Sequence, residues 1–166
     1  MTVEGPPPGG EPAGRAGLHV LLVTSNGGHL AQLLALRPWW ETRRRTWVTH
    51  DKADARSLLA AEAVVWAFHP TTRHVPNMLR NARLAWRALR ELRPDLVVST
   101  GAGVAVPFFA CARLLGIATC YIETYDRLDA RSMSGRLCRP FTDLFLLQWP
   151  EQQRAYPGGI VIGRLL

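Results

Sequence analysis

The chain has 166 residues, of which 48% are hydrophobic and 20% are charged, and it carries a formal net charge of +7 at pH 7. This length and this balance predict a single globular domain with its own core, and they exclude a mainly disordered chain. The cysteines Cys111, Cys120 and Cys138 follow neither a metal-binding spacing nor a disulfide framework. We therefore expect reduced thiols, as in a cytosolic protein.

Residues 1–17 are rich in proline, glycine and glutamate and contain no apolar stretch. This composition predicts a disordered tail, and neither a signal peptide nor a membrane anchor. The longest apolar region, 104–122, is interrupted by Pro107, Arg113 and Gly116, which favours a helix followed by a strand over a membrane span. We therefore expect one folded domain over 18–166 and no transmembrane segment.

Short apolar segments alternate with helical ones along the rest of the chain. Several apolar segments are continuous runs of valine, leucine and isoleucine, as expected for strands that are covered on both faces. The expected strands are 18–24, 46–50, 63–68, 96–100, 118–124, 144–148 and 160–162, and the expected helices are 30–36, 53–61, 77–92, 104–115, 132–140 and 151–156. This order predicts the α/β class, with a Rossmann-like, mostly parallel sheet and helices on both faces.

The helix expected at 77–92 lies between Pro76 and Pro94, which mark its limits. It carries two neighbouring stripes at helical spacing. The apolar stripe is Met78, Leu79, Ala82, Ala85, Trp86, Leu89 and Leu92, and the basic stripe is Arg80, Arg83, Arg87 and Arg90. Either the helix simply packs on the sheet with its arginines in solvent, or its face also contacts anionic lipid headgroups through Arg80, Arg83, Trp86, Arg87 and Arg90.

Two glycine turns each follow a predicted strand and precede a predicted helix. The first turn is Ser25, Asn26, Gly27 and Gly28, and the second contains Thr100, Gly101 and Gly103. Such turns bring backbone N–H groups and the positive end of a helix dipole to the carboxyl edge of the sheet. Each turn alone is equally consistent with a structural role, but together they predict an anion held between two helix starts.

Two ionisable residues are expected at the same edge. His29 begins the helix after the first turn, and it is either a helix-start residue or a general base for a hydroxyl nucleophile. Glu123 ends an apolar strand, where it binds a sugar hydroxyl, acts as a base, or caps the following turn. His50, His69 and His74 share no metal-binding spacing, so no metal site is predicted.

A stand-alone nucleotide-binding domain, similar to an oxidoreductase, is the alternative of a different class. Asp51 follows the second predicted strand, roughly where a ribose-binding acid lies in dinucleotide-binding folds. The first turn, however, lacks the G-x-G-x-x-G fingerprint of those folds.

The second half of the chain carries motifs that point to one family. They lie at 127–136, 143–150, 156–157 and 162–165, and they are joined by 94–98 and by the turn at 25–29. The most specific are Ser-Met-Ser-Gly at 132–135 and Gln-Trp-Pro at 148–150. Through these motifs, residues 18–166 closely resemble the acceptor-side, non-catalytic subunit of the split N-acetylglucosaminyltransferase that adds the second sugar to dolichol pyrophosphate. They also resemble the bacterial half-enzymes of capsule and exopolysaccharide assembly.

That family is similar to the N-terminal half of a two-domain GT-B glycosyltransferase, such as the enzyme that makes lipid II. The resemblance implies that the domain binds a polyprenyl-pyrophosphate-linked sugar and recruits a separate catalytic subunit. The glycines of the two turns would surround the pyrophosphate, and His29 and Glu123 would lie at the cleft where the sugar is transferred. The domain would need no cofactor of its own, because the partner subunit would hold the UDP-sugar donor.

Two features depart from the family's pattern. Eukaryotic members carry an N-terminal membrane span where this chain has a tail rich in proline and glycine. This difference favours peripheral attachment at the cytoplasmic face of the membrane through helix 77–92, and no nucleic-acid partner is expected. Asn26 replaces the small residue that is common before the glycine pair. A third hypothesis is a scaffold in which His29 and Glu123 have no catalytic role.

Overall fold

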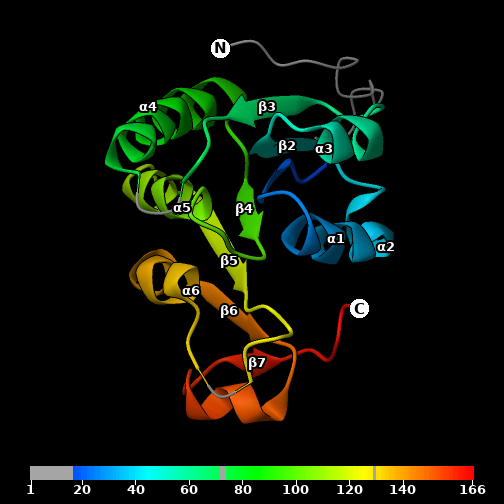
Figure 1. Ribbon diagram of the computed structural model, residues 1–166, viewed down its shortest axis with the longest axis vertical. Helices are drawn as coiled ribbons and strands as arrows, with labels where there is room; N and C mark the ends of the chain where they lie inside the picture. The colour runs from blue at the N-terminus through cyan, green and yellow to red at the C-terminus, as the bar shows by residue number, and fades with distance from the viewer. Residues whose placement is uncertain (1–16, 72–73, 129) are drawn as a thin grey trace.

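The computed structural model describes residues 17–71, 74–128 and 130–166. Apart from Gly17, the predicted tail at 1–17 lies outside the described residues. Seven strands form one sheet in the order β3-β2-β1-β4-β5-β6-β7, and every neighbouring pair is parallel (Figure 1). The strands are β1 Val20–Val23, β2 Arg45–His50, β3 Val64–Ala67, β4 Leu96–Ser99, β5 Ala118–Ile122, β6 Leu144–Leu147 and β7 Ile160–Val161.

Helices cover both faces of the sheet, with α4, α5 and α6 on one side and α1 and α2 on the other (Figure 1). The α-helices are α1 Gly28–Ala35, α2 Arg37–Trp40, α3 Ala53–Leu58, α4 Val75–Leu92, α5 Ala105–Leu114 and α6 Met133–Cys138. Two 3-10 helices follow, η1 Arg139–Phe141 and η2 Pro150–Arg154. The predicted fold class and all seven predicted strands are confirmed. The segment predicted as a helix at 151–156 is the 3-10 helix η2, and the single turn α2 was not predicted.

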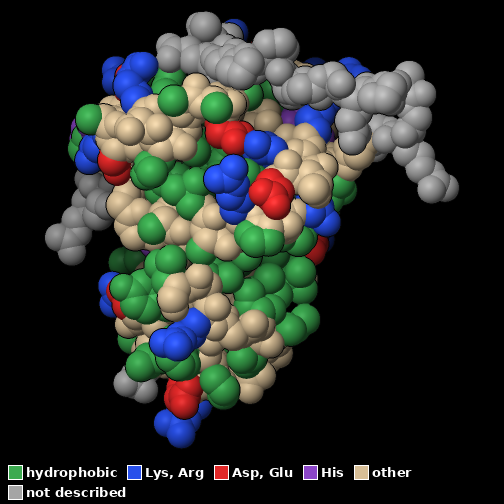
Figure 2. All heavy atoms as spheres, turned by 90° about the vertical axis from the view of Figure 1, so that its right-hand side faces the viewer, with side chains coloured by type: hydrophobic (Ala, Val, Ile, Leu, Met, Phe, Trp, Pro, Cys, Tyr) green, Lys and Arg blue, Asp and Glu red, His purple; other side chains and the backbone are tan. Residues whose placement is uncertain are grey.

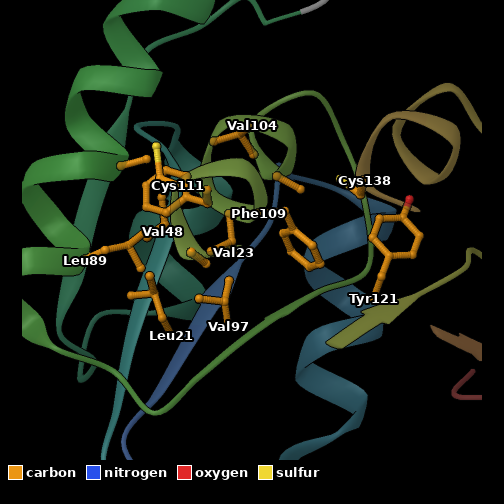
Figure 3. Close-up of a cluster of buried hydrophobic side chains, with 14 of the residues drawn as sticks. Leu21, Val23, Val48, Leu89, Val97, Val104, Phe109, Cys111, Tyr121 and Cys138 are labelled. Carbon is orange, nitrogen blue, oxygen red and sulfur yellow. The ribbon is translucent and has the colours of Figure 1, made fainter. Parts of the chain in front are cut away.

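The core has two halves because successive residues of a covered strand point to opposite faces. Leu21 and Val23 of β1 point towards α4 and α5, where they pack with Phe109 (Figure 3). Val20 and Leu22 of the same strand belong to the second buried cluster, on the α1 side. The sheet is therefore covered on both sides, and the loops that follow the strands leave it at its carboxyl edge.

Two tryptophans, Trp40 and Trp47, belong to the second buried cluster, on the α1 side of the sheet. Trp40 is only 3% exposed, and its ring meets that of Trp47 edge to face at 5.4 Å between centroids. Its indole N–H donates to the carbonyl of Leu33 at 2.7 Å. The aromatic pair therefore serves core packing, which is the more common role of such residues.

The burial of α4 differs from the predicted apolar stripe. Met78, Leu79 and Trp86 are 46%, 64% and 40% exposed, whereas Asn77 and Asn81 are buried. The Asn81 amide donates to the carbonyl of Phe68 and accepts from its N–H, both at 2.9 Å. These hydrogen bonds satisfy the buried amide and fix the helix register. As a result, part of the predicted core stripe faces solvent beside the arginines.

The C-terminal segment lies on the α1 side of the sheet, on the face that Figure 2 shows. Hydrophobic side chains gather over the middle of that face, with charged ones above them and again at the lower end (Figure 2). The buried Gln148 side chain holds the segment, because its carbonyl accepts from Leu165 N–H at 3.0 Å and its amide donates to Gln32 of α1 at 2.6 Å. Among the described helices, none is both long and apolar enough to cross a membrane.

Candidate functional site

A cavity of about 740 Å³ opens at the carboxyl edge of the sheet. Its walls come from the starts of α1, α4, α5 and α6 and from the loop after β5. Among the lining residues are His29, His74, Gly103, Arg127, Ser132 and Ser134. Ligands of parallel α/β sheets bind at this edge, so the cavity is the candidate site of the domain. Across the described part of the chain, no group of three or more His, Cys, Asp or Glu residues is placed to hold a metal ion.

The second glycine turn borders this cavity. The Ser99 hydroxyl accepts from Gly101 N–H at 3.0 Å, and the Ser134 hydroxyl accepts from Ala102 N–H at 3.2 Å. Gly103 lines the cavity, and its N–H has no acceptor among the described residues. The N–H of Gly103 is therefore available to a ligand, whereas that of Gly101 already has an intramolecular acceptor.

Gly101 has a steric role in the same turn. Its φ of +116° lies in a region that side chains disfavour, and a Cβ there would lie 2.9 Å from the Tyr121 hydroxyl and 3.1 Å from Cε1 of His29. The absence of a side chain lets the imidazole, the phenol and Ser134 come together around one backbone position.

The first glycine turn is arranged differently. Gly27 N–H donates to the Asp54 carboxylate at 3.3 Å, and the Asn26 amide donates to the other oxygen of that carboxylate at 3.0 Å. Desolvation raises the pKa of Asp54, but hydrogen bonds from the backbone of Ala55 and Gly27 and from Asn26 outweigh it and lower the pKa overall. An ionised carboxylate thus occupies Gly27 N–H, while the Ser25 hydroxyl donates to the neighbouring Asn26 carbonyl at 3.4 Å. Gly28 is exposed and begins α1.

His29 joins the two turns. Its Nδ1 lies 3.0 Å from the carbonyl of Thr100, and the Thr100 hydroxyl donates to the carbonyl of His29 at 2.8 Å. Because a carbonyl only accepts hydrogen bonds, Nδ1 carries the proton, and the neutral ring then presents the lone pair of Nε2. The structure therefore places His29 at the cavity with the tautomer that a general base requires.

Glu123 lies behind the cavity and not in its wall. Its side chain is fully buried, and its carboxylate accepts from Thr124 N–H and from the Ser132 hydroxyl, each at 3.0 Å. A Cβ added at Gly135 would lie 2.5 Å from the carboxylate, so only glycine fits beside it. This arrangement favours the structural interpretation of Glu123, which is to order the loop after β5 and the start of α6.

Ser132 and Ser134 are functional candidates that were not predicted from the sequence as site residues. Ser132 caps α6 by accepting from Gly135 N–H at 2.9 Å, and Ser134 reaches across to the second glycine turn. Both hydroxyls lie near the phenol of Tyr121, whose pKa is raised by burial and by the nearby Glu123. The signal was present in the Ser-Met-Ser-Gly stretch, which combines a favoured capping residue with a glycine.

The predicted membrane contacts all lie on the outer side of α4. Arg80, Arg83, Arg87 and Arg90 are exposed, and Trp86 is exposed between them. The guanidinium of Arg90 lies 5.9 Å from the Trp86 ring centroid. The same helix contributes Val75 and Met78 to the wall of the cavity, so this outer surface is continuous with the candidate site.

A family model described as "Oligosaccharide biosynthesis protein Alg14 like" matches residues 69–165, which is more than half of the chain. The chain belongs to this family. This match confirms the family that the sequence motifs indicated. The matched part of this Alg14-like chain includes all the cavity residues from α4 onward.

Curated relatives carry the same family name. The mouse protein "UDP-N-acetylglucosamine transferase subunit ALG14" is 26% identical over 184 residues, covering 92% of this Alg14-like chain and 85% of the relative. The protein of that name from Schizosaccharomyces pombe is 35% identical over 77 residues, covering 42% of the chain.

Solved structures share the fold at low sequence identity. MurG from Acinetobacter baumannii superposes with a TM-score of 0.72 at 19% identity, over 87% of this chain and 44% of MurG. S. aureus MnaA, solved with UDP, gives a TM-score of 0.72 at 10% identity, over 89% of this chain and 45% of MnaA. The Alg14-like chain thus spans less than half the length of these proteins.

The nucleotide-binding alternative is not favoured. Asp51 pairs with Arg56, whose Nη2 donates to the carboxylate at 2.8 Å. Hydrogen bonding to Arg56 lowers the pKa of Asp51, which therefore stays ionised and paired. Asp51 is thus already paired with Arg56, and the match to the Alg14-like family model disfavours the nucleotide-binding alternative.

Proposed function

We propose that this chain is the acceptor-binding subunit of a two-chain glycosyltransferase that builds lipid-linked oligosaccharides or polysaccharides. The partner would be a separate catalytic subunit that holds a UDP-sugar, and this chain would bind the polyprenyl-pyrophosphate-linked acceptor. Membership of the Alg14-like family supports the proposal, because the curated relatives are named as subunits of a UDP-N-acetylglucosamine transferase.

The observation that carries the acceptor role is the convergence of helix starts on one cavity. The first turns of α1, α4 and α5 and the α6 cap line it, and the N–H of Gly103 has no other acceptor among the described residues. Helix N-termini carry partial positive charge, which stabilises phosphate. Arg127 adds a guanidinium at the wall, and its only described carboxylate partner is Asp126, 3.9 Å away and exposed.

The two glycine turns would contribute unequally to binding of the pyrophosphate. Asp54 already occupies Gly27 N–H and places negative charge at the first turn. A pyrophosphate is repelled by that charge, so it would bind at Gly103 and the start of α5. Thr100 and Gly101 would shape this turn, and Ser25, Asn26 and Gly28 would support the start of α1.

His29 would act as the general base. Its Nε2 would take the proton of the acceptor's attacking hydroxyl as the new glycosidic C–O bond forms. The bond between the sugar's anomeric carbon and the phosphate oxygen would break at the same step, and UDP would leave on the partner subunit. Glu123 would act only by ordering the loop that contains Thr124 and Arg127.

Peripheral attachment to the cytoplasmic face of the membrane would bring the lipid to the cavity. The outer side of α4 combines exposed Val75, Leu79 and Trp86 with a row of arginines. Apolar side chains beside basic ones are typical of helices that lie in the interface of anionic membranes. Since Val75 and Met78 also line the cavity, the isoprenoid could pass from the bilayer to the site along α4.

The test is reconstitution with the catalytic subunit, for which the products of neighbouring genes are the first candidates. Sugar transfer from a UDP-sugar to a polyprenyl-pyrophosphate acceptor should require both chains. Equal activity from the partner alone would overturn the recruitment model. Thermal-shift measurements with NAD(P) and with a polyprenyl pyrophosphate separate the proposal from the nucleotide-binding alternative, since only the pyrophosphate lipid should raise the melting temperature.

A further inference from the structure

Two histidines line the cavity, and the backbone gives them opposite hydrogen-bonding patterns. His29 reaches the cavity from the start of α1, with its Nδ1 against the carbonyl of Thr100 at 3.0 Å. His74 reaches it from the N-cap of α4, where its Nδ1 accepts from the N–H of Asn77 at 3.2 Å. In one ring Nδ1 is therefore a donor, and in the other it is an acceptor.

This difference determines what each ring offers to a ligand. A neutral imidazole has one donor nitrogen and one acceptor nitrogen. Because Nδ1 of His29 donates, its Nε2 is an acceptor. Because Nδ1 of His74 accepts, its Nε2 carries the proton and is a donor, for which the described residues provide no acceptor. The cavity thus presents one imidazole acceptor and one imidazole donor.

We propose that His74 is a binding residue for the acceptor, and that its Nε2–H donates to an oxygen of the pyrophosphate. This inference rests on the proposed function. The donor of His74 suits a phosphate oxygen, which only accepts, and the lone pair of His29 suits a hydroxyl, which donates. The two rings together would distinguish the charged end of the acceptor from its sugar.

The α4 cap keeps the His74 donor in place. At the N-cap of α4, His74 is held by the hydrogen bond that it accepts from Asn77 N–H, and the amide of Asn77 in turn donates to the carbonyl of Pro70 at 3.0 Å. The charged groups described in the cavity wall are Asp126 and Arg127, whose exposed side chains lie 3.9 Å apart. His74 therefore supplies a neutral, oriented donor beside the positive end of the 18-residue helix α4.

Two substitutions separate capping from ligand binding. H74S retains a favoured capping oxygen for Asn77 N–H but removes the imidazole donor, whereas H74A removes both. We expect the melting temperature of H74S to stay close to that of the wild type and that of H74A to fall. Both variants should bind farnesyl pyrophosphate and inorganic pyrophosphate about tenfold to a hundredfold more weakly than the wild-type chain, as expected for loss of a hydrogen bond to a charged group.

Nuclear magnetic resonance of the full chain with ¹⁵N-labelled histidine reads the tautomers directly. Long-range ¹H–¹⁵N spectra should show unprotonated Nε2 in His29 and unprotonated Nδ1 in His74. The Nε2–H signal of His74 should shift when inorganic pyrophosphate is added. A purely structural cap would not respond to that ligand.

The outcomes distinguish the role of His74 from the proposed acceptor role of the whole chain. If the wild type binds both pyrophosphates and H74S binds them equally well, the assignment of His74 is overturned and the proposed function stands. If the wild type binds neither probe, the proposed acceptor role itself is overturned. Weakened binding by H74S with an unchanged melting temperature supports the assignment.

Discussion

His29 and Thr100, which are 71 residues apart in the sequence, are joined by two hydrogen bonds. The ring of His29 donates to the backbone carbonyl of Thr100, and the hydroxyl of Thr100 donates to the backbone carbonyl of His29. This reciprocal pair links the turn after β1 to the turn after β4. The orientation of the imidazole is therefore set by two strands at the centre of the sheet.

Replacement of Thr100 tests this link. T100V keeps the shape of the side chain but removes the hydroxyl, which should destabilise the fold by about 1 kcal/mol, the usual net value of one hydrogen bond. T100S keeps the hydroxyl and is the matched control. Urea unfolding followed by circular dichroism measures the difference. A T100V variant as stable as T100S would show that the hydroxyl contributes nothing.

Replacement of His29 tests the proposed base. In H29N, the side-chain amide can still donate to the Thr100 carbonyl, but the acceptor corresponding to Nε2 is lost. We expect kcat of the reconstituted two-chain enzyme to fall by about 10²–10⁴-fold, the usual contribution of a general base, with little change in KM for the lipid acceptor. A variant with unchanged kcat would leave the domain with a binding role only.

Glu123 should behave as a structural residue. E123A leaves Thr124 N–H without its buried acceptor and should destabilise the fold by about 1–3 kcal/mol. E123Q keeps one carbonyl oxygen for that N–H and should be closer to the wild type in stability. Thermal unfolding and sugar transfer are measured on both variants. A well-folded E123Q enzyme with a hundredfold lower kcat would contradict the structural role and restore a catalytic one.

Charge reversal on α4 tests membrane contact. The triple variant R80E/R83E/R87E should bind vesicles that contain phosphatidylglycerol at least a hundredfold more weakly, since each basic residue near such a surface contributes about 1 kcal/mol. The variant R37E/R44E/R154E changes the net charge equally at exposed positions outside α4 and is the control. Sedimentation with vesicles measures both. Equal loss in the two variants would indicate a general charge effect and not a contact through α4.

The stability of the domain should depend on pH through His50. Its side chain is 6% exposed, and burial together with the nearby His69 and Lys52 lowers its pKa from 6.5 to about 4. Between these two values the unfolded chain binds more protons than the folded one, so stability falls as the pH decreases from 6.5 towards 4.

The variant H50N removes this titration and should flatten the dependence. A residual slope of the same sign should remain, because burial and Arg44 also lower the pKa of His19. Urea midpoints measured across this pH range give the comparison. A variant with the same slope as the wild type would exclude His50 as a source of acid sensitivity.

Local patterns were sufficient to predict the strands and the two turns. Runs such as Val20–Val23 are apolar at every position, which is unambiguous for a strand covered on both sides. The turns were visible because their glycines interrupt strand and helix patterns at defined places. His29 followed from its position at a helix start, a purely local property.

Long-range hydrogen bonds account for what could not be predicted. Nothing near Gly27 in the sequence indicates that Asp54 occupies its N–H, because that contact depends on how α3 meets α1. The periodicity of α4 predicted Leu79 in the core. In the structure the buried Asn81 side chain forms hydrogen bonds with the backbone of Phe68, and the rotation of α4 about its axis that these bonds fix leaves Leu79 exposed. Glu123 was indistinguishable from an active-site acid until its burial behind Ser132 was known.

The unequal occupation of the two glycine turns also gives the carboxyl edge of the sheet, where the cavity opens, an electrostatic direction. The exposed carboxylate of Asp54 lies beside the start of α1, outside the cavity wall, and the N–H of Gly103 at the start of α5 has no acceptor among the described residues. A long substrate with one dianionic end therefore has one electrostatically favoured way to enter, and the reversed pose brings like charges together. Charge would then select the orientation in which the substrate binds, before any sugar is recognised. A D54N variant would be expected to lose this preference for one orientation.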